Sequence, residues 1–367
     1  MPKSRRAEAI WIEARNRWQL NAQRDGKRKT FTSSIPGRRG KHEAEAKADD
    51  WLDAGQPEDL RFDSAWAIFL DHLSNTTGKA NWADYESIGR NWLLPALARK
   101  HTSDIAMRHI QDIINDAANQ GRSARTCKNI KDKFFSFVSY AEDQKWIIDA
   151  GKSKKVKVSK KARKGKRQIA QPEQLKRLFS IDTETCRGIV RPCFFIHAFR
   201  VIALTGLRRG ELCAIRPEDI QGNVINVSRS VNRMGIITDG KTENAQRRVP
   251  ITSRTRLELD AQQKMLESLG IQSEWLFPDG EGEILDSNVL YNHWRRYANE
   301  HEITATLHEL RHTFVSITAN DMPAPLLKRV VGHSPTMDTF GVYGHAVDGE
   351  LIHALNLMEE TFSRILE

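Results

Sequence analysis

The sequence predicts an α-rich, multidomain protein: a small basic β-rich module at the N-terminus, a helical domain, and an α+β domain with a small antiparallel sheet. Three observations support this. The chain has 367 residues, of which 39% are hydrophobic, which is enough to fill two or three hydrophobic cores. Apolar residues alternate near the N-terminus but recur at helical spacing further on. The excess positive charge is concentrated in a terminal arm and in one internal segment.

Hydrophobic patterns define the first two domains. Over residues 10–35 apolar and polar residues alternate as in strands, with a turn signal at 24–27, and residues 41–54 are rich in helix formers. We therefore expect a small basic β-rich module with one helix over residues 1–57. Residues 61–150 show helical periodicity interrupted by glycines and a proline, which predicts a compact domain of about four helices.

The third domain, residues 171–367, is predicted to be α-rich with a small inserted sheet. Pro172 lies near the first turn of a helix, and the apolar run 188–205 indicates a long buried helix. Residues 224–227 and 247–251 have the character of strands. Beyond them the pattern is again mainly helical.

The charge is distributed unevenly. The formal net charge is +10; residues 1–41 hold 12 basic and 3 acidic side chains, residues 151–170 hold ten basic and no acidic ones, and residues 171–367 hold 22 basic and 26 acidic ones. We interpret 151–170 as a basic interdomain linker that contributes nothing to a hydrophobic core and is extended without a partner. It is either a solvated linker or a strap for a polyanion, namely DNA, RNA or an anionic membrane surface. Its candidate contact residues are Lys154, Lys155, Lys157, Lys160, Lys161, Arg163 and Lys164.

Composition also argues against several classes of protein. No run of 18 apolar residues occurs, so we expect no membrane span. The N-terminus lacks the apolar segment of a signal peptide, so we expect an intracellular protein. Four cysteines without a CxxC pair predict buried or inert thiols rather than a zinc site or a disulfide framework.

Two local signals in the third domain bear on anion chemistry. Gly206 ends an apolar helix just before Arg208, whose planar guanidinium suits a phosphate. Arg208 and Glu211 are equally well spaced for a structural ion pair. Lys241 lies at a turn signal, residues 239–242, at the tip of the predicted hairpin. A lysine at such a tip is ordinarily just solvated.

Two further signals lie closer to the C-terminus. His308 and Arg311 are three residues apart, so on a helix they share one face. His333 stands in a Val-Gly-His-Ser-Pro segment that is followed by Tyr343. Taken singly, such a histidine is ordinarily a satisfied polar residue, and such a tyrosine is ordinarily part of the packing.

Residues 308–312 also spell H-E-x-x-H, the zinc-protease helix. In that alternative His308 and His312 bind zinc and Glu309 polarises a water molecule. The G-x-x-H continuation that would supply a third ligand is absent after His312. We therefore expect no metal site, and a zinc protease is kept as an alternative.

Together the motifs resemble those of the tyrosine recombinase (phage integrase) family. T-G-x-R, the hairpin lysine, H-x-x-R, an L-G-H-like segment and the following tyrosine all occur in the family's order and spacing. Val331 stands where leucine is usual. The six positions that match the family's catalytic residues are Arg208, Lys241, His308, Arg311, His333 and Tyr343.

The resemblance implies a site-specific DNA recombinase, an integrase that integrates or excises a mobile element or prophage through a covalent 3′-phosphotyrosine. Tyr343 is then the nucleophile, and the two arginines neutralise charge on the phosphoryl oxygens. Lys241 is the general acid for the leaving 5′ oxygen, His308 lowers the cost of ionising the tyrosine, and His333 hydrogen-bonds the phosphate. The resemblance implies no cofactor and no metal.

The family layout also implies how the domains meet DNA. Residues 1–57 bind arm sites, while residues 61–150, the helical core-binding domain, and residues 171–367 bind the core site from opposite faces, joined by the linker. The implied partners are double-stranded DNA, three further copies in a homo-tetramer on synapsed DNA, a recombination directionality factor and a host DNA-bending protein. The implied location is the cytoplasm of a bacterial host, on the nucleoid when bound to DNA.

Three further alternatives stay open beside the zinc protease. Residues 348–367 carry one apolar stripe, which either closes the core of its own domain or docks on a neighbouring subunit; we favour docking. A DNA-binding regulator with a degenerate recombinase fold would not need all six catalytic positions filled. A type IB topoisomerase shares the chemistry, and the three-part layout favours a recombinase.

Overall fold

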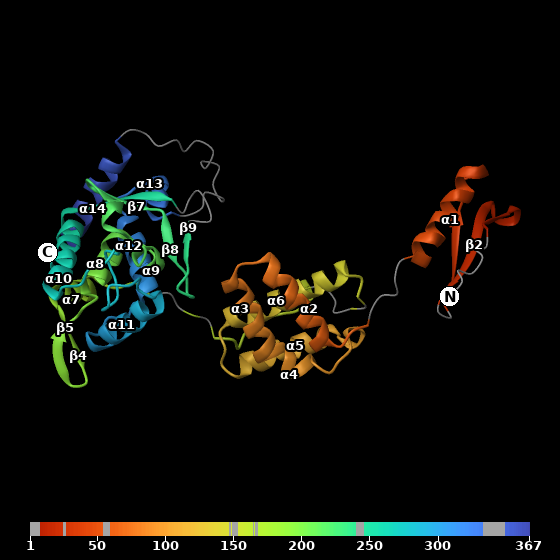
Figure 1. Cartoon of the computed structure of the whole chain (residues 1–367), viewed down its shortest axis with the longest axis horizontal. Helices are drawn as coiled ribbons and strands as arrows, with labels where there is room; N and C mark the ends of the chain where they lie inside the picture. Colours follow the sequence, from red (N-terminus) through yellow and green to blue (C-terminus); the bar gives the residue numbers. More distant parts are fainter. Residues whose placement is uncertain are drawn as a thin grey trace. The chain divides into compact units, whose positions relative to one another are not determined.

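The chain forms two compact units, Met1–Lys164 and Gly165–Glu367. Buried hydrophobic residues make two clusters in the first unit and one in the second. The helices and strands of both units are labelled in Figure 1. Within the described part of the chain, no helix is long and apolar enough to cross a membrane. The computed structural model describes residues 8–24, 27–53, 59–146, 148, 153–163, 165, 168–239, 246–332 and 349–367.

The N-terminal module is a three-stranded antiparallel sheet covered by one helix. The strands follow the order β1-β2-β3, with Leu20 of β2 opposite Phe31 of β3. These two side chains are buried against Ala44 and Ala48 of the helix. The β-rich module with one helix is therefore confirmed. Its elements are β1 (Ile10–Ile12), β2 (Arg17–Arg24), β3 (Lys27–Ser33) and α1 (Gly37–Asp53).

The helical domain packs around a cluster of aromatic rings. Phe62, Trp66 and Phe69, which recur at helical spacing, lie against Phe137 with ring centroids 5.1–5.7 Å apart. Pro95 lies at the end of one continuous helical stretch, residues 79–97, in which residues 89–93 form a turn of π-helix. The elements are α2 (Phe62–Thr76), α3 (Lys79–Ile88), the π-helix η2 (Gly89–Leu93), α4 (Leu94–Leu97), the short η3 (Thr102–Asp104), α5 (Met107–Asn119) and α6 (Ala124–Asp143).

The basic linker differs from its prediction over residues 153–163, because this segment packs on the helical domain. Val156 and Ala162 are buried in that domain's core. Lys157 donates its N–H to the side chain of Gln111, which donates back to the Lys157 carbonyl at 2.8 Å. This packing could not be predicted from the composition, because Val156 and Ala162 are single apolar residues in a stretch rich in lysine.

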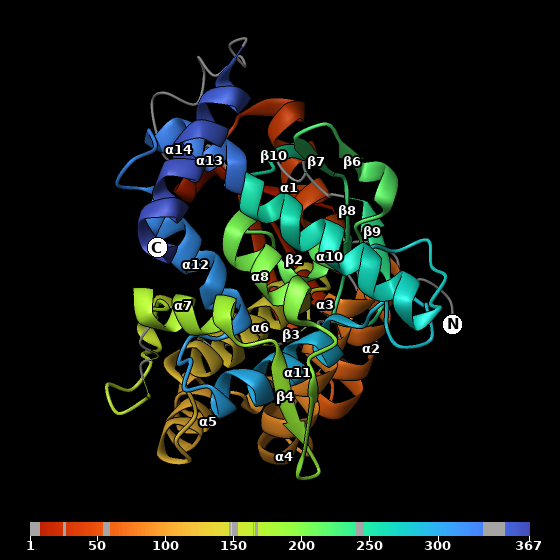
Figure 2. The same cartoon turned by 90° about the vertical axis from the view of Figure 1, so that its left-hand side faces the viewer.

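The second unit is built around a buried helix, α8 (Ile196–Thr205), in which nine of ten residues are buried. Helices α10 and α12 pack against it (Figure 2). Sequence periodicity placed the start of this helix too early, since residues 189–192 form a strand. The helices are α7 (Pro172–Ser180), α8, α9 (Arg209–Leu212), α10 (Ser253–Leu269), α11 (Ser287–Glu300), α12 (Leu307–Thr318), α13 (Ala324–Val331) and α14 (Glu350–Leu366).

The strands of this unit form one small sheet and two hairpins. The predicted pairing is confirmed, because Arg247 of β10 lies opposite Val227 of β7 in an antiparallel ladder. The hairpins β4–β5 and β8–β9 were not predicted. The strands are β4 (Thr183–Cys186), β5 (Ile189–Pro192), β6 (Ile220–Gln221), β7 (Val224–Val227), β8 (Arg229–Val231), β9 (Ile237–Asp239) and β10 (Arg247–Pro250), with the short helix η5 (Pro217–Asp219) before β6.

The apolar stripe of the C-terminal helix α14 is used within this chain. Ala354, Met358 and Phe362 are buried in the core of the second unit. The ring of Phe362 lies parallel to that of Phe314 on α12, with centroids 6.1 Å apart. The helix thus closes the core of its own unit, the reading that the sequence analysis placed second.

All four thiols are free, as predicted. Cys127, Cys193 and Cys213 are buried, and Cys186 is half-buried. Burial raises the pKa of the Cys193 and Cys213 thiols to about 12, so both stay protonated and unreactive at neutral pH.

Candidate active site

The first candidate arginine, Arg208, lies at the junction of α8 and α9. Gly206 ends α8 in the left-handed conformation, with φ 65°, and a Cβ there would lie 2.5 Å from the ring of Phe314. Only glycine fits, so the chain turns tightly and delivers Arg208 at the start of α9. The Arg208 side chain is 42% exposed, which leaves its guanidinium accessible to an anion.

The second candidate, Arg311, extends from α12 to the same junction. It is buried, and its guanidinium donates to the carbonyls of Gly206 at 2.6 Å and Val331 at 2.5 Å. Burial, with the nearby charge of Arg208, lowers the pKa of Arg311 to about 10. Arg311 therefore stays positively charged at neutral pH. The structure thus brings together two motifs that lie about a hundred residues apart in sequence.

A buried carboxylate, Glu211, joins Arg208 to a third arginine that sequence reasoning did not identify as part of the site. Arg208 donates to Glu211 at 2.7 Å, and Arg247 donates to both Glu211 oxygens at 3.0 and 2.8 Å. The ion pair of Arg208 and Glu211, one of the two readings of that motif, is therefore present. Burial alone would raise the pKa of Glu211, but the bonds and charges of Arg247 and Arg208 outweigh it and hold the pKa below its ordinary value.

A signal for Arg247 existed in the sequence. Alternate residues of a strand face the same side, and Val249, two positions on, is fully buried. A core-facing arginine must be paired, so the strand pattern at 247–250 already implied a buried acidic partner.

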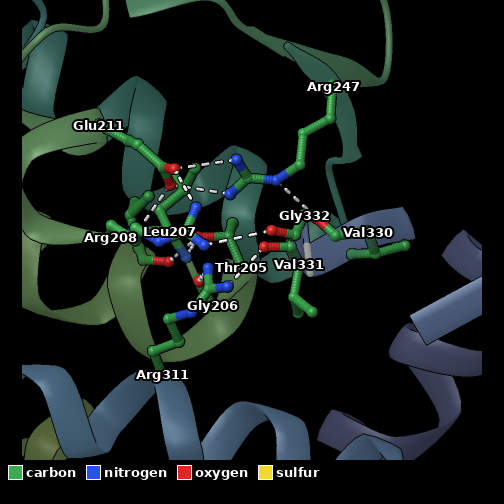
Figure 3. Close-up of polar contacts among 11 residues, drawn as sticks. Thr205, Gly206, Leu207, Arg208, Glu211, Arg247, Arg311, Val330, Val331 and Gly332 are labelled. Carbon is green, nitrogen blue, oxygen red and sulfur yellow. Dashed lines mark hydrogen bonds and ion pairs between the residues drawn. The ribbon is translucent and has the colours of Figure 1, made fainter. Parts of the chain in front are cut away.

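Three consecutive carbonyls at the end of α13 hold the three arginines. Val330 accepts from Arg247 at 2.9 Å, Val331 accepts from Arg311, and Gly332 accepts from Arg208 at 3.1 Å (Figure 3). The last carbonyls of a helix lack intrahelical partners and lie at the negative end of its dipole. The carbonyls at the end of α13 thus bind the three guanidinium groups and fix them relative to one another.

His308 lies in the first turn of α12, three residues before Arg311, and is exposed. Its ring meets that of His312 edge-on, with centroids 4.8 Å apart. The carboxylate of Glu309 makes structural hydrogen bonds. It accepts from the backbone N–H of Thr306, as part of the capping box of α12, and from the backbone N–H of Gln168 at 2.8 Å. These bonds leave Glu309 poorly placed for the water-activating role of the zinc-protease alternative, and the described residues contain no cluster of three metal-ligating side chains.

Three predicted catalytic residues, Lys241, His333 and Tyr343, lie outside the described residues. Strand β9 ends two residues before Lys241, and the C-cap residue of α13, Gly332, directly precedes His333 in the sequence. Lys164 of the linker is likewise outside the described part. The other predicted linker contacts are exposed, namely Lys154, Lys155, Lys157, Lys160, Lys161 and Arg163.

Comparison with curated proteins finds recombinases. A tyrosine recombinase XerC-like protein of Caldanaerobacter subterraneus subsp. tengcongensis is 22% identical over 360 residues, covering 88% of this chain and 90% of that protein. The ICEBs1 integrase of Bacillus subtilis is 25% identical, covering 68% of this chain and 72% of the integrase.

Solved structures show the same fold. The integrase of transposon Tn1549, in complex with transposon right end DNA, aligns with a TM-score of 0.62 at 20% identity, over 81% of this chain and 99% of that one. A lambda integrase tetramer bound to a Holliday junction aligns with a TM-score of 0.60 at 17% identity, over 93% of this chain and 100% of that one. Residues 168–350, which contain all six motif positions, match the phage integrase family. The chain therefore belongs to the phage integrase family, the tyrosine-type site-specific recombinases that cleave and rejoin DNA.

Proposed function

We propose that this integrase cleaves its site by attack of Tyr343 on a DNA phosphodiester, and that Arg208 and Arg311 form the phosphate-binding centre. The observation that carries this proposal is the attachment of both guanidiniums to adjacent carbonyls, those of Val331 and Gly332. Two cations fixed in this way lose little conformational freedom when a phosphate arrives, which is the requirement for electrostatic stabilisation of a transition state.

The proposed step balances as follows. The Tyr343 hydroxyl gives its proton to the His308 imidazole as its oxygen forms a bond to phosphorus. The bond from phosphorus to the 5′ oxygen breaks, and Lys241 gives that oxygen a proton. Ionising a free tyrosine at pH 7 costs roughly 4 kcal/mol, because its pKa is near 10. The arginine charges and the His308 imidazole lower this cost, and His333 hydrogen-bonds the phosphate. Religation reverses the step: a 5′ hydroxyl attacks the 3′-phosphotyrosine and releases Tyr343.

Arg208 and Arg311 have different roles in this proposal. Arg208, which is 42% exposed, makes the direct contact with the phosphodiester, because its guanidinium is accessible. Arg311, which is buried, supplies a second positive charge behind Arg208 and holds the backbone of the site through its bonds to the carbonyls of Gly206 and Val331. Its pKa of about 10 supports this role, since the charge persists through the neutral range.

The other parts of the chain bind double-stranded DNA in this proposal. Residues 1–57 bind arm sites, while residues 61–150 and 171–367 bind the core site. The face of the N-terminal sheet opposite α1 carries hydrogen-bonding side chains suited to base edges and phosphates. Residues on this face include Gln19, Asn21, Arg28, Thr30 and Thr32.

Residues 151–170 cross the DNA backbone between the two core-binding parts. The exposure of the lysines and the anchoring of Val156 in the helical domain support this, because the cations are presented on a fixed surface. Four subunits act on synapsed DNA in the bacterial cytoplasm, with a directionality factor and a host DNA-bending protein as accessory partners.

A nicked suicide substrate tests the proposal. Wild-type protein is expected to form a covalent protein–DNA adduct in the presence of EDTA, and Tyr343→Phe is expected to form none. An adduct formed by the Phe variant would refute the nucleophile assignment. Adduct formation that requires zinc would favour metal chemistry at His308 and His312 instead.

A further inference from the structure

Arg247 is buried beside the proposed phosphate site but is not accessible to DNA. Its side chain is 5% exposed. Three of its N–H groups are used within the protein: Nε donates to the Val330 carbonyl at 2.9 Å, and the two terminal nitrogens donate to Glu211 at 3.0 and 2.8 Å. The side chain thus spans from β10 to α9 and to the end of α13 (Figure 3). Any effect of Arg247 on phosphate chemistry must therefore pass through another residue.

Glu211 is the residue through which that effect passes. Its Oε1 accepts from both Arg208 and Arg247, and its Oε2 accepts from Arg247 and from the Arg208 backbone N–H. One negative charge is therefore shared between two guanidiniums. If Arg247 were absent, the whole carboxylate charge would fall on Arg208, the cation that the phosphate needs.

Arg247 also restrains the far side of Arg208. Arg208 donates to Gly332 and Arg247 to Val330, so both are tied to the same end of α13. Loss of Arg247 removes the hydrogen bond that ties this end of the helix to β10. The residue therefore controls both the charge balance and the position of Arg208.

We propose that Arg247 is a positioning residue for DNA cleavage, which holds Glu211 and the end of α13 so that Arg208 stays aimed at the phosphodiester and its positive charge is not fully offset by Glu211. The inference rests on the proposed function, in which Arg208 binds the scissile phosphate. The competing reading is a buried ion pair that contributes only to folding stability.

The rate of adduct formation on a saturating suicide substrate separates the two readings, when it is measured beside DNA affinity and thermal unfolding. Arg247→Met is expected to slow adduct formation on the order of 100-fold in the folded protein, as for other misplaced catalytic groups. The Kd for DNA is expected to stay within about twofold, because Arg247 makes no phosphate contact. Arg248→Met is the matched control, because Arg248 is the next residue of β10 and is exposed. Its rate is expected to stay within about twofold of wild type.

A second substitution tests the route through Glu211. In the Arg247→Met background, Glu211→Gln removes the uncompensated carboxylate and is expected to restore about tenfold of the lost rate. A purely structural ion pair predicts no such recovery. Arg247→Lys keeps the charge without the fork and is expected to fall between wild type and Arg247→Met.

The outcomes are distinct. A wild-type rate in folded Arg247→Met, or a double variant no faster than the single one, overturns the inference. If Arg247→Met does not fold, Arg247→Lys decides: a loss of about tenfold at unchanged Kd supports the inference, and a wild-type rate overturns it. A wild-type protein that forms no Tyr343-dependent adduct refutes the proposed function itself, which is a separate result.

Discussion

Arg208 donates a hydrogen bond to the carbonyl of Gly332, 3.1 Å away, and Gly332 immediately precedes His333 in the sequence. The same guanidinium reaches Glu211, three residues along its own segment. A single planar side chain therefore links the first arginine motif to the backbone that leads into the second histidine motif. A phosphate bound by Arg208 would therefore lie close to the end of α13 at Gly332.

This relationship predicts that lysine cannot replace Arg208. Lysine keeps the charge but lacks the fork that makes both contacts, so Arg208→Lys is expected to slow adduct formation on the order of 10²–10³-fold, as for loss of one transition-state donor. Arg209→Lys is the control, since Arg209 lies over the ring of Tyr291, 5.5 Å from its centroid. Equal losses in the two variants would mean that this region responds to any change of arginine.

Glu211 predicts a pH dependence of stability. At pH 7, Glu211→Gln leaves the buried guanidinium of Arg247 and the partly exposed one of Arg208 without their counter-charge. This is expected to lower the free energy of unfolding by about 3–5 kcal/mol. The folded-state pKa of Glu211 lies below its ordinary 4.5, so the unfolded state binds more protons between the two values. The stabilisation is therefore complete above about pH 4.5 and is lost as pH falls through the folded-state pKa.

Urea unfolding of the wild-type protein and of Glu211→Gln, at pH 7 and below pH 4.5, checks this. The difference between their free energies of unfolding should become smaller at the lower pH. Glu218→Gln is the control, because Glu218 is 66% exposed and 3.6 Å from Arg216. Its effect should be much smaller. If the difference in free energy of unfolding between the wild type and Glu211→Gln stays constant with pH, the carboxylate contributes through packing and not through its charge.

Strong periodicity made most elements of this fold predictable. The alternation over 10–35 and the helical spacing of the aromatic residues after Phe62 each produced the element expected. The hairpin β4–β5 was missed, because its turn places Arg187 at φ 52° and Gly188 at φ 80°. Two positive φ values ordinarily select Asn-Gly or Asp-Gly, and Arg-Gly carries no such signal.

The site was only partly predictable. Motif spacing identified Arg208 and Arg311, and the structure brings them together. The role of the Val330–Gly332 carbonyls was not accessible, because backbone acceptors leave no trace in side-chain identity. The alternation of residues along the strand could have predicted that Arg247 faces inward. Its partner Glu211 could not be predicted, because Glu211 lies 36 residues earlier and is brought near only by the fold.

The linker predicts a change in salt dependence. Neutralising Lys154, Lys155 and Lys157 by glutamine is expected to reduce the slope of log Kd against log salt by about 0.9 for each DNA phosphate that the variant no longer neutralises. Val156→Ala is the control: it should cost about 1.5–3 kcal/mol of stability, since Val156 is buried, but leave the slope unchanged. Binding measurements on a core-site duplex over a salt series decide. An unchanged slope in the triple variant would place the linker away from the DNA backbone.

The C-terminal helix offers a test of where its apolar stripe is used. Phe362 is fully buried against Phe314. If that packing is made within one chain, Phe362→Ala should lower stability by about 3–5 kcal/mol. The loss in Tm should then be the same at all protein concentrations, because unfolding of a monomer is unimolecular. Ile352→Ala is the control, because Ile352 is 65% exposed and should matter little.

Docking on a neighbouring subunit predicts the opposite concentration dependence. The wild-type Tm would rise with protein concentration, and Phe362→Ala would abolish the rise. Helix α14 can pack on its own unit in the free protein and on a neighbouring subunit in the assembly only if the two packings have similar free energies. Recombination on synapsed DNA would then be lost in Phe362→Ala while single-site adduct formation is kept. Loss of both activities together would assign the helix to the core of its own unit.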